Sequence, residues 1–171
     1  MNAPLLAMIL PAILSFASLG GCADNGWSSD WSKSGDVNVR IDSAAVMKPK
    51  MLSKSGKEYE DQFEMLVIHI TVENKASDAI KYRRWEAGQL SAGTSLKDDN
   101  GKSYQNRLFS TTNAVGGVKG SSTMLESGKQ LRDVLLFEPP AEGAKTLKLT
   151  LAPQTGSGDG HAFEIPASAW K

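Results

Sequence analysis

The chain has 171 residues, and its 19 basic and 19 acidic residues give a formal net charge of zero. This length suits one domain and an export segment, and an apolar content of 40% supplies one core but not several membrane spans. Neutralising phosphates needs a clear surplus of basic residues, so the balanced charge argues against nucleic acid as a partner.

The first 21 residues contain no charged side chain and are rich in leucine, isoleucine and alanine. Their apolar part of about fifteen residues indicates an export signal, because a membrane-spanning helix needs roughly twenty. The segment ends in Leu19-Gly20-Gly21-Cys22, which resembles the bacterial lipobox, where small residues precede a cysteine. This resemblance implies cleavage before Cys22 and attachment of a lipid, with palmitate-type acyl chains, to that residue. The alternatives are an ordinary secretory signal with a coincidental cysteine, or an uncleaved anchor.

Cys22 is the only cysteine, so no disulfide can form within the chain and the fold must rely on its apolar core. Ala23 follows it, where an aspartate would suggest retention at an inner membrane. We therefore expect a lipid-anchored protein of the cell envelope, sorted to the outer membrane or the cell surface. Residues 22–35 predict a flexible tether, because serine, glycine and aspartate dominate there. Within it, Trp27 and Trp31 could insert among lipid headgroups. The alternative, which we favour, is that they pack loosely on the domain or stay exposed.

Alternation of apolar and polar residues predicts strands in the rest of the chain. The longest such run is 63–74, which we interpret as the central strand, with Leu66, Ile68, Ile70 and Val72 on one face. Other predicted strands, in chain order, cover residues 37–41 with a candidate continuation over 43–47, then 79–85, 102–104, 129–138, 146–151 and 163–165.

The segments between these runs predict turns and loops. Residues 48–61 are polar and predict a surface loop, and residues 105–120 predict an irregular, flexible one. Asp98-Asp99-Asn100-Gly101 predicts a tight turn, since Asn-Gly tolerates positive φ. Seven or eight short strands separated by turns are typical of an all-β, antiparallel sandwich, which we assign to residues 36–171.

The order of several short motifs resembles an uncharacterised immunoglobulin-like domain family of bacterial lipoproteins, related in fold to mycobacterial secreted immunoprotective antigens. The matching segments are the strand 63–74 with its Val-Glu-Asn corner, the hairpin 96–104 with Asp-x-x-Gly-Lys-x-Tyr, the turn 125–129 and the strand end 135–140. The resemblance covers about residues 36–165. It implies an exported immunoglobulin-like β-sandwich, and it implies no catalytic residues.

Tyr82, Arg83, Arg84 and Trp85, next to Lys81, form the one local cluster of cations and aromatic rings. Such a strand can bind an anionic glycan or a protein partner through bidentate pairing and stacking, so these four residues are the candidate ligand-binding site. The alternative, which we favour, is a solvated strand face with Tyr82 or Trp85 closing the core.

No other pattern predicts chemistry. The two histidines, His69 and His161, have no partner at metal-ligand or catalytic spacing. Residues 98–101 lack the spaced ligands of a calcium loop, and the glycine-rich segment 116–120 lacks the spacing of a phosphate-binding loop. The sequence therefore predicts no catalytic residue, no metal and no cofactor.

These features together predict a membrane-tethered lipoprotein of the cell envelope with a non-enzymatic immunoglobulin-like binding domain. Its partner would be the membrane, through the lipid on Cys22, and an envelope protein or glycan. Two alternatives stay open, namely an envelope hydrolase or metal-dependent enzyme with an unrecognised site, and a structural or assembly lipoprotein.

Overall fold

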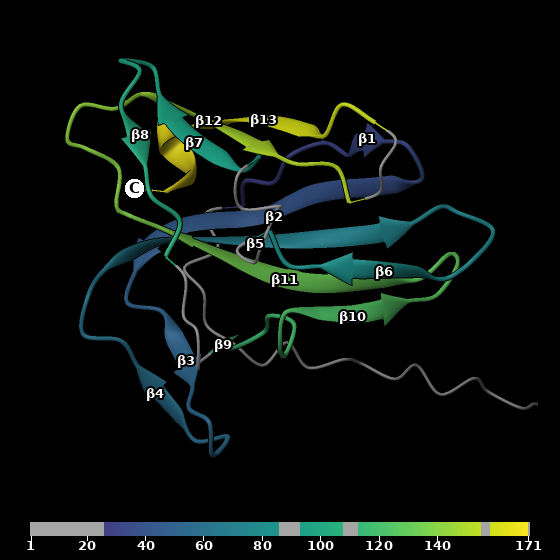
Figure 1. Ribbon diagram of the computed structural model, residues 1–171. Coiled ribbons are helices and arrows are strands. Elements are labelled where there is room, and N and C mark those ends of the chain that lie inside the picture. The colour runs from purple at the N-terminus through teal and green to yellow at the C-terminus, as the bar shows by residue number, and fades with distance from the viewer. Residues whose placement is uncertain (1–25, 86–92, 108–112, 155–157, 171) are drawn as a thin grey trace, which may run out of the picture.

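The computed structural model describes residues 26–85, 93–107, 113–154 and 158–170. These residues form an all-β molecule with one short 3₁₀ turn (Figure 1). The elements are β1 (Ser32–Ser34), β2 (Val37–Met47), β3 (Lys50–Leu52), β4 (Glu58–Glu60), β5 (Met65–Asn74), β6 (Ile80–Arg83), β7 (Ser95–Asp98), β8 (Ser103–Tyr104), β9 (Asn113–Ala114), β10 (Ser122–Leu125), β11 (Gln130–Phe137), β12 (Thr146–Leu151), β13 (His161–Pro166) and η1 (Ala167–Ala169).

The first main sheet has the order β1-β2-β5-β11, with β5 in an interior position. Antiparallel pairing places Ile68 of β5 between Ala44 of β2 and Leu135 of β11. The register of β2 shifts between Ile41 and Ser43, so residues 43–47 continue the first strand after a bulge. The sequence prediction of a central strand over 63–74 is confirmed, although its first two residues precede β5.

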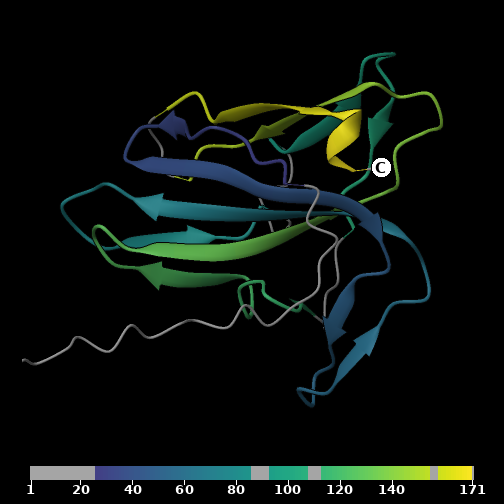
Figure 2. The same cartoon turned by 180° about the vertical axis from the view of Figure 1, so that it is seen from behind.

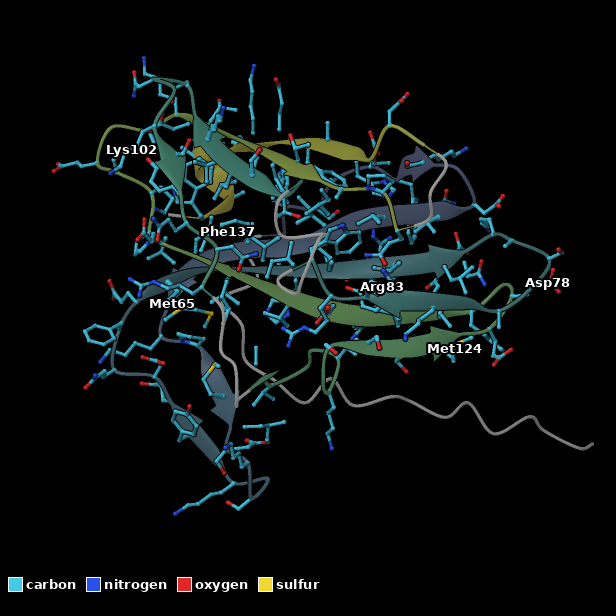
Figure 3. The ribbon with its side chains drawn as sticks, in the orientation of Figure 1. Met65, Asp78, Arg83, Lys102, Met124 and Phe137 are labelled. Atoms are coloured by element: carbon cyan, nitrogen blue, oxygen red, sulfur yellow. The ribbon has the colours of Figure 1, made fainter. Side chains whose placement is uncertain are left out.

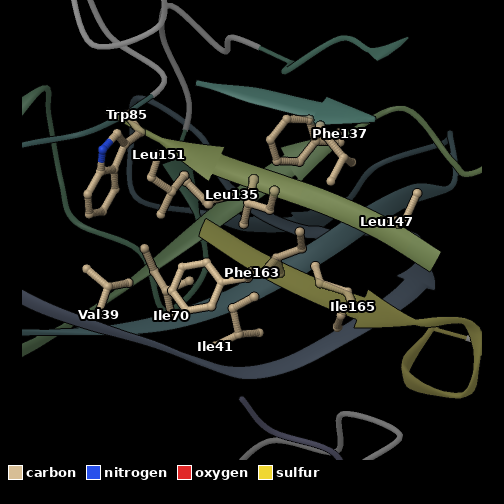
Figure 4. Close-up of a cluster of buried hydrophobic side chains, with 14 of the residues drawn as sticks. Val39, Ile41, Ile70, Trp85, Leu135, Phe137, Leu147, Leu151, Phe163 and Ile165 are labelled. Carbon is tan, nitrogen blue, oxygen red and sulfur yellow. The ribbon is translucent and has the colours of Figure 1, made fainter. Parts of the chain in front are cut away.

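The second main sheet, β13-β12-β7-β8, packs over the first, and their apolar faces enclose the main core (Figure 4). Leu147, Leu149 and Leu151 of β12 are fully buried, while Lys148 and Thr150 between them are exposed. This alternation is the physical reason that two layers form, because each sheet has one face to hide from water. The predicted all-β antiparallel sandwich is confirmed, and its two main sheets contain eight strands.

A second apolar cluster lies on the opposite face of the first sheet. Met65 and Val67 of β5 and Val134 of β11 face away from the main core and are covered by Met51 of β3 and Ala114 of β9. The prediction of a loop over residues 48–61 is therefore wrong, since β3 and β4 form a hairpin, and this hairpin projects from one end of the body in both views (Figures 1 and 2). Burial of Met51 explains the hairpin, which a local polar composition conceals.

The ordered domain begins earlier than the predicted boundary at residue 36. β1 lies inside the segment expected to be a tether, and it pairs with β2. Ser29 adds backbone and side-chain hydrogen bonds to Ile41. Trp27 packs against the main core, and the guanidinium of Arg40 lies 5.0 Å from the ring centre of Trp31. Both indoles thus contact the domain. Residues 1–25, which include the predicted signal segment and Cys22, lie outside the described residues.

The Val-Glu-Asn corner at the end of β5 is a structural device. The buried amide of Asn74 donates to the carbonyls of Asp78 and Leu125, at 2.8 and 2.9 Å, and accepts from the N–H of Ala76. Its backbone pairs with the turn 125–129, where Gly128 has a φ of 68°. Two of the motifs that carry the family resemblance therefore lie against each other and fix one corner of the sandwich.

We predict that Ile68→Ala lowers the free energy of unfolding by about 3 kcal/mol, the usual effect of a large-to-small change in a packed core. Ile68 has no exposed surface, whereas Met124 is 59% exposed. The control Met124→Ala should change stability by no more than about 0.5 kcal/mol. Urea denaturation followed by tryptophan fluorescence measures both, and equal effects would contradict the core described here.

Candidate functional site

The four predicted ligand-binding residues lie on β6 and directly after it. β6 pairs with β10, and the two strands form a separate two-stranded ribbon, called the β6–β10 ribbon below. Tyr82 and Trp85 have no exposed surface and Arg84 is only 7% exposed, while Arg83 is exposed (Figure 3). Three of the four side chains therefore attach the ribbon to the body, and of these four only Arg83 projects into solvent.

A buried carboxylate receives the ribbon. Asp133 of β11 lies in the same inward-facing row as Ile41 and Ile70, and it has no exposed surface. The hydroxyl of Tyr82 donates to it at 2.6 Å, and Nε of Arg84 lies 3.5 Å from the same oxygen. An ion of this kind is stable inside a protein only when it is paired and hydrogen-bonded, so Asp133 requires the ribbon to be in place.

The glycine-rich segment 116–120 has a role that sequence analysis missed, since it folds over Asp133. The N–H of Val118 donates to the other carboxylate oxygen at 3.0 Å, and so does the N–H of Val134 at 2.9 Å. A Cβ at Gly117 would stand 3.0 Å from that oxygen, which explains the small residue there. The loop thus resembles an anion-binding loop whose anion is part of the protein.

Further contacts fix the ends of the ribbon. The indole N–H of Trp85 donates to the carbonyl of Ala152 at 2.6 Å, and its ring meets that of Tyr82 edge-on at 5.6 Å. The side-chain amide of Gln154 accepts from the N–H of Arg83 at 2.9 Å and donates to its carbonyl at 2.7 Å. With the Asn74 bond to Leu125, these contacts hold both strands in one position.

The outer edge of β10 does not take part in these contacts, and no described strand pairs with it. Figures 1 and 2 show β10 near the margin of the molecule, and the register pairs it with β6. Met124 at this edge is one of three strongly exposed large apolar side chains among the described residues, with Tyr59 and Phe63. The arrangement presents a firmly held strand edge to solvent, which is a geometry that can pair with an extended peptide.

The two histidines lie in different surroundings. His161, at the start of β13, is 1% exposed, contacts the ring of Trp85 edge-on, and has its Nδ1 3.3 Å from the hydroxyl of Ser32. Burial lowers the pKa of His161 to about 4. Burial also lowers the pKa of His69, although Asp42 opposes that shift. Both rings are therefore neutral at pH 7.

The carboxylate of Asp98 is occupied by its own hairpin. One oxygen accepts from the N–H groups of Asn100 and Lys102 at 2.9 Å, and the other accepts from the hydroxyl of Tyr104 at 2.7 Å. These bonds, that of Tyr104 foremost, lower the pKa of Asp98. Gly101 has a φ of 83°, which the turn requires. The predicted tight turn is confirmed, and the Asp-x-x-Gly-Lys-x-Tyr motif is explained by it.

A shallow hollow of about 340 Å³ opens where β7 and β8 separate. It exists because the chain after β8 leaves its sheet, and Gln105 and Arg107 bond instead to the end of β11. Its lining has no charged side chain and consists of Thr94, Ser95, Leu96, Ser103, Tyr104, Gln105 and Asn106. Within the described part of the chain, no group of three or more acidic, histidine or cysteine side chains could hold a metal ion, and no helix is long and apolar enough to cross a bilayer.

We predict that Asp133→Asn destabilises the protein by about 3 kcal/mol, because the change breaks a buried ion pair with Arg84. Tyr82→Phe should cost about 2 kcal/mol, the value of a hydrogen bond to a charged group. Since both changes remove the same charge-assisted hydrogen bond, the double variant should lose at least about 0.5 kcal/mol less than the sum. Asp78→Asn, at an exposed carboxyl, is the control. Strict additivity in urea denaturation would argue against the network.

A second prediction concerns pH. The unfolded chain binds a proton at His161 near pH 6.5, whereas the folded protein binds it only near pH 4. Stability should therefore fall as the pH drops from about 6.5 to about 4, and the contribution of His161 should be constant outside this range. His161→Gln should reduce the slope of stability against pH between pH 7 and pH 5. Protonation of His69 should contribute a further slope of the same sign. An unchanged slope in thermal denaturation would contradict the burial of a neutral ring.

Comparison with known proteins agrees with the fold. The yjhA protein of Bacillus subtilis superposes with a TM-score of 0.51 at 20% identity, over 80% of this chain and 95% of its own. A proposed lipoprotein of the same bacterium, ycdA, gives a TM-score of 0.49 at 18% identity, over 81% of this chain and 39% of its own. None of the curated proteins matches this chain. The model of a domain of unknown function, DUF4352, matches residues 29–162, and the chain belongs to this family.

Proposed function

We propose that this protein is a lipid-anchored lipoprotein of the cell envelope, whose β-sandwich is a non-enzymatic binding module. The observation that carries the proposal is the position of Cys22. This only cysteine follows an uncharged apolar segment and small residues, and it lies four residues before the first described residue of the domain. A signal of this kind calls for a lipid at the start of a domain that folds immediately after it.

The state of the reactive side chains supports a non-enzymatic role. The carboxylates of Asp98 and Asp133 each accept at least three hydrogen bonds from their own surroundings. His161 is buried against Trp85. These groups serve the fold, whereas a general base needs an open approach to its substrate.

The binding element of this proposal is the β6–β10 ribbon together with its exposed Arg83. It follows the cationic and aromatic cluster that the sequence singles out, and the buried members of that cluster hold it in place. The immunoglobulin-like relationship belongs to the same proposal, and the two packed four-stranded sheets support it. Ala23 after Cys22 supports sorting to an outer membrane or the cell surface.

We predict that cells fed with labelled palmitate incorporate the label into the wild-type protein, and that Cys22→Ser reduces it to background. Ala23→Ser, next to the modified residue, is the matched control and should retain the label. Partition into detergent on phase separation should follow the same order. The proposal of a lipid anchor is wrong if the wild type carries no label. It is also wrong if Cys22→Ser remains as membrane-bound and as strongly labelled as the wild type.

A further inference from the structure

We propose that the outer edge of β10 binds an extended segment of a partner polypeptide, which joins the β6–β10 ribbon as a third strand. This inference rests on the proposed function, a tethered binding module, and it specifies the chemistry of the partner.

The pairing of the ribbon determines which backbone groups face outward. The N–H of Arg84 donates to the carbonyl of Ser121 at 3.0 Å, and the register then continues with Tyr82 opposite Thr123. In an antiparallel pair the intervening residues direct their backbone groups away from the partner strand, so those of Ser122 and Met124 face the open edge. Two N–H and two C=O groups at strand spacing match the backbone of an extended peptide.

The opposite edge of the ribbon already holds a peptide-like group. The carboxamide of Gln154 has the donor and the acceptor of a peptide bond, and it makes both strand-type hydrogen bonds to Arg83, at 2.9 and 2.7 Å. The edge of β6 is thereby closed at this position. No described strand pairs with the outer edge of either strand, but the backbone of Arg83 on the β6 side is bonded to Gln154, whereas the edge of β10 is open among the described residues.

The composition of β10 differs from that of two other edge strands, β4 and β13. Exposed edge strands usually carry charges or proline, which prevent pairing with other chains. β4 has two glutamates in three residues and β13 ends in Pro166, whereas Ser122–Leu125 contains neither a charge nor a proline. Met124 is 59% exposed there and offers an apolar contact to the added strand. We therefore infer a partner segment that carries an apolar side chain opposite Met124.

The test uses the full-length protein, purified in detergent, and a defined peptide. The probe is an acetylated and amidated peptide that alternates threonine and valine, with a lysine at each end. Residue-resolved hydrogen exchange should show the amides of Ser122 and Met124 slowed about tenfold at nine-tenths occupancy, because only the unoccupied fraction exchanges. The amides of Thr123 and Leu125, already directed to β6, should not change.

Three controls separate strand addition from other contacts. A peptide methylated at the nitrogens that would face β10 should give no protection, since it lacks the donors. Ser122→Pro removes one outward N–H without touching the bonds to β6, and Met124→Lys adds a charge at the edge, so both should abolish protection. Tyr59→Lys adds the same charge at another exposed apolar residue and should leave it intact.

Several results would overturn the proposal. One is the absence of protection at millimolar peptide, and another is equal protection by the methylated peptide. A third is an effect of Tyr59→Lys as large as that of Met124→Lys. The last is protection that rises with protein concentration alone, which would indicate pairing between copies of this chain. Palmitate labelling of the same preparation reports the anchor separately. A labelled protein without peptide binding refutes the docking site only, and peptide binding by an unlabelled protein refutes the anchor only.

Discussion

The buried carboxylate of Asp133 determines where the β6–β10 ribbon lies. It stands in a row of apolar side chains that face the core, where an unpaired ion would be strongly destabilising. Its partners come from two other parts of the chain, with Tyr82 and Arg84 after β5 and the N–H of Val118 in the loop before β10. An apolar residue could give similar stability, but it would accept many arrangements of its neighbours. The carboxylate accepts one, and so the ribbon and the glycine-rich loop are fixed together.

A fixed position matters because two strands alone are barely stable in water. The ribbon is held by the hydroxyl of Tyr82, by the indole of Trp85 on the carbonyl of Ala152, and by the amide of Asn74 on the carbonyl of Leu125. Each contact joins the ribbon to a different part of the sandwich. A strand edge that is already ordered loses little conformational freedom when a ligand pairs with it, and this favours binding through backbone groups. The same buried groups that stabilise the fold therefore prepare the exposed edge.

Alternation in the sequence predicts the strands that are half buried, since burial on one face is what creates alternation. This is why β12 is found from sequence, whereas β5 and β11 are found as apolar runs, because parts of both strands are buried on both faces. β3, β4 and β10 are missed because each is short, and partners distant in the chain decide their pairing. Asp133 is missed because it lies beside Arg132 in a strand and looks like a solvent-facing charge. Its position in the alternation of β11 could have revealed its burial. Leu131, Leu135 and Phe137 lie on the same face of the strand and pack on the core.

The motifs on which the family resemblance is based describe the fold more than the activity. Asn74 satisfies three backbone groups at a corner, and Asp98 with Gly101 closes a hairpin. Each of these residues has a complete structural explanation, so their presence says little about a ligand. A binding site is better sought where the chain departs from the needs of the fold. The uncharged edge of β10, with Met124 in solvent, is such a place, because neither packing nor solubility requires it.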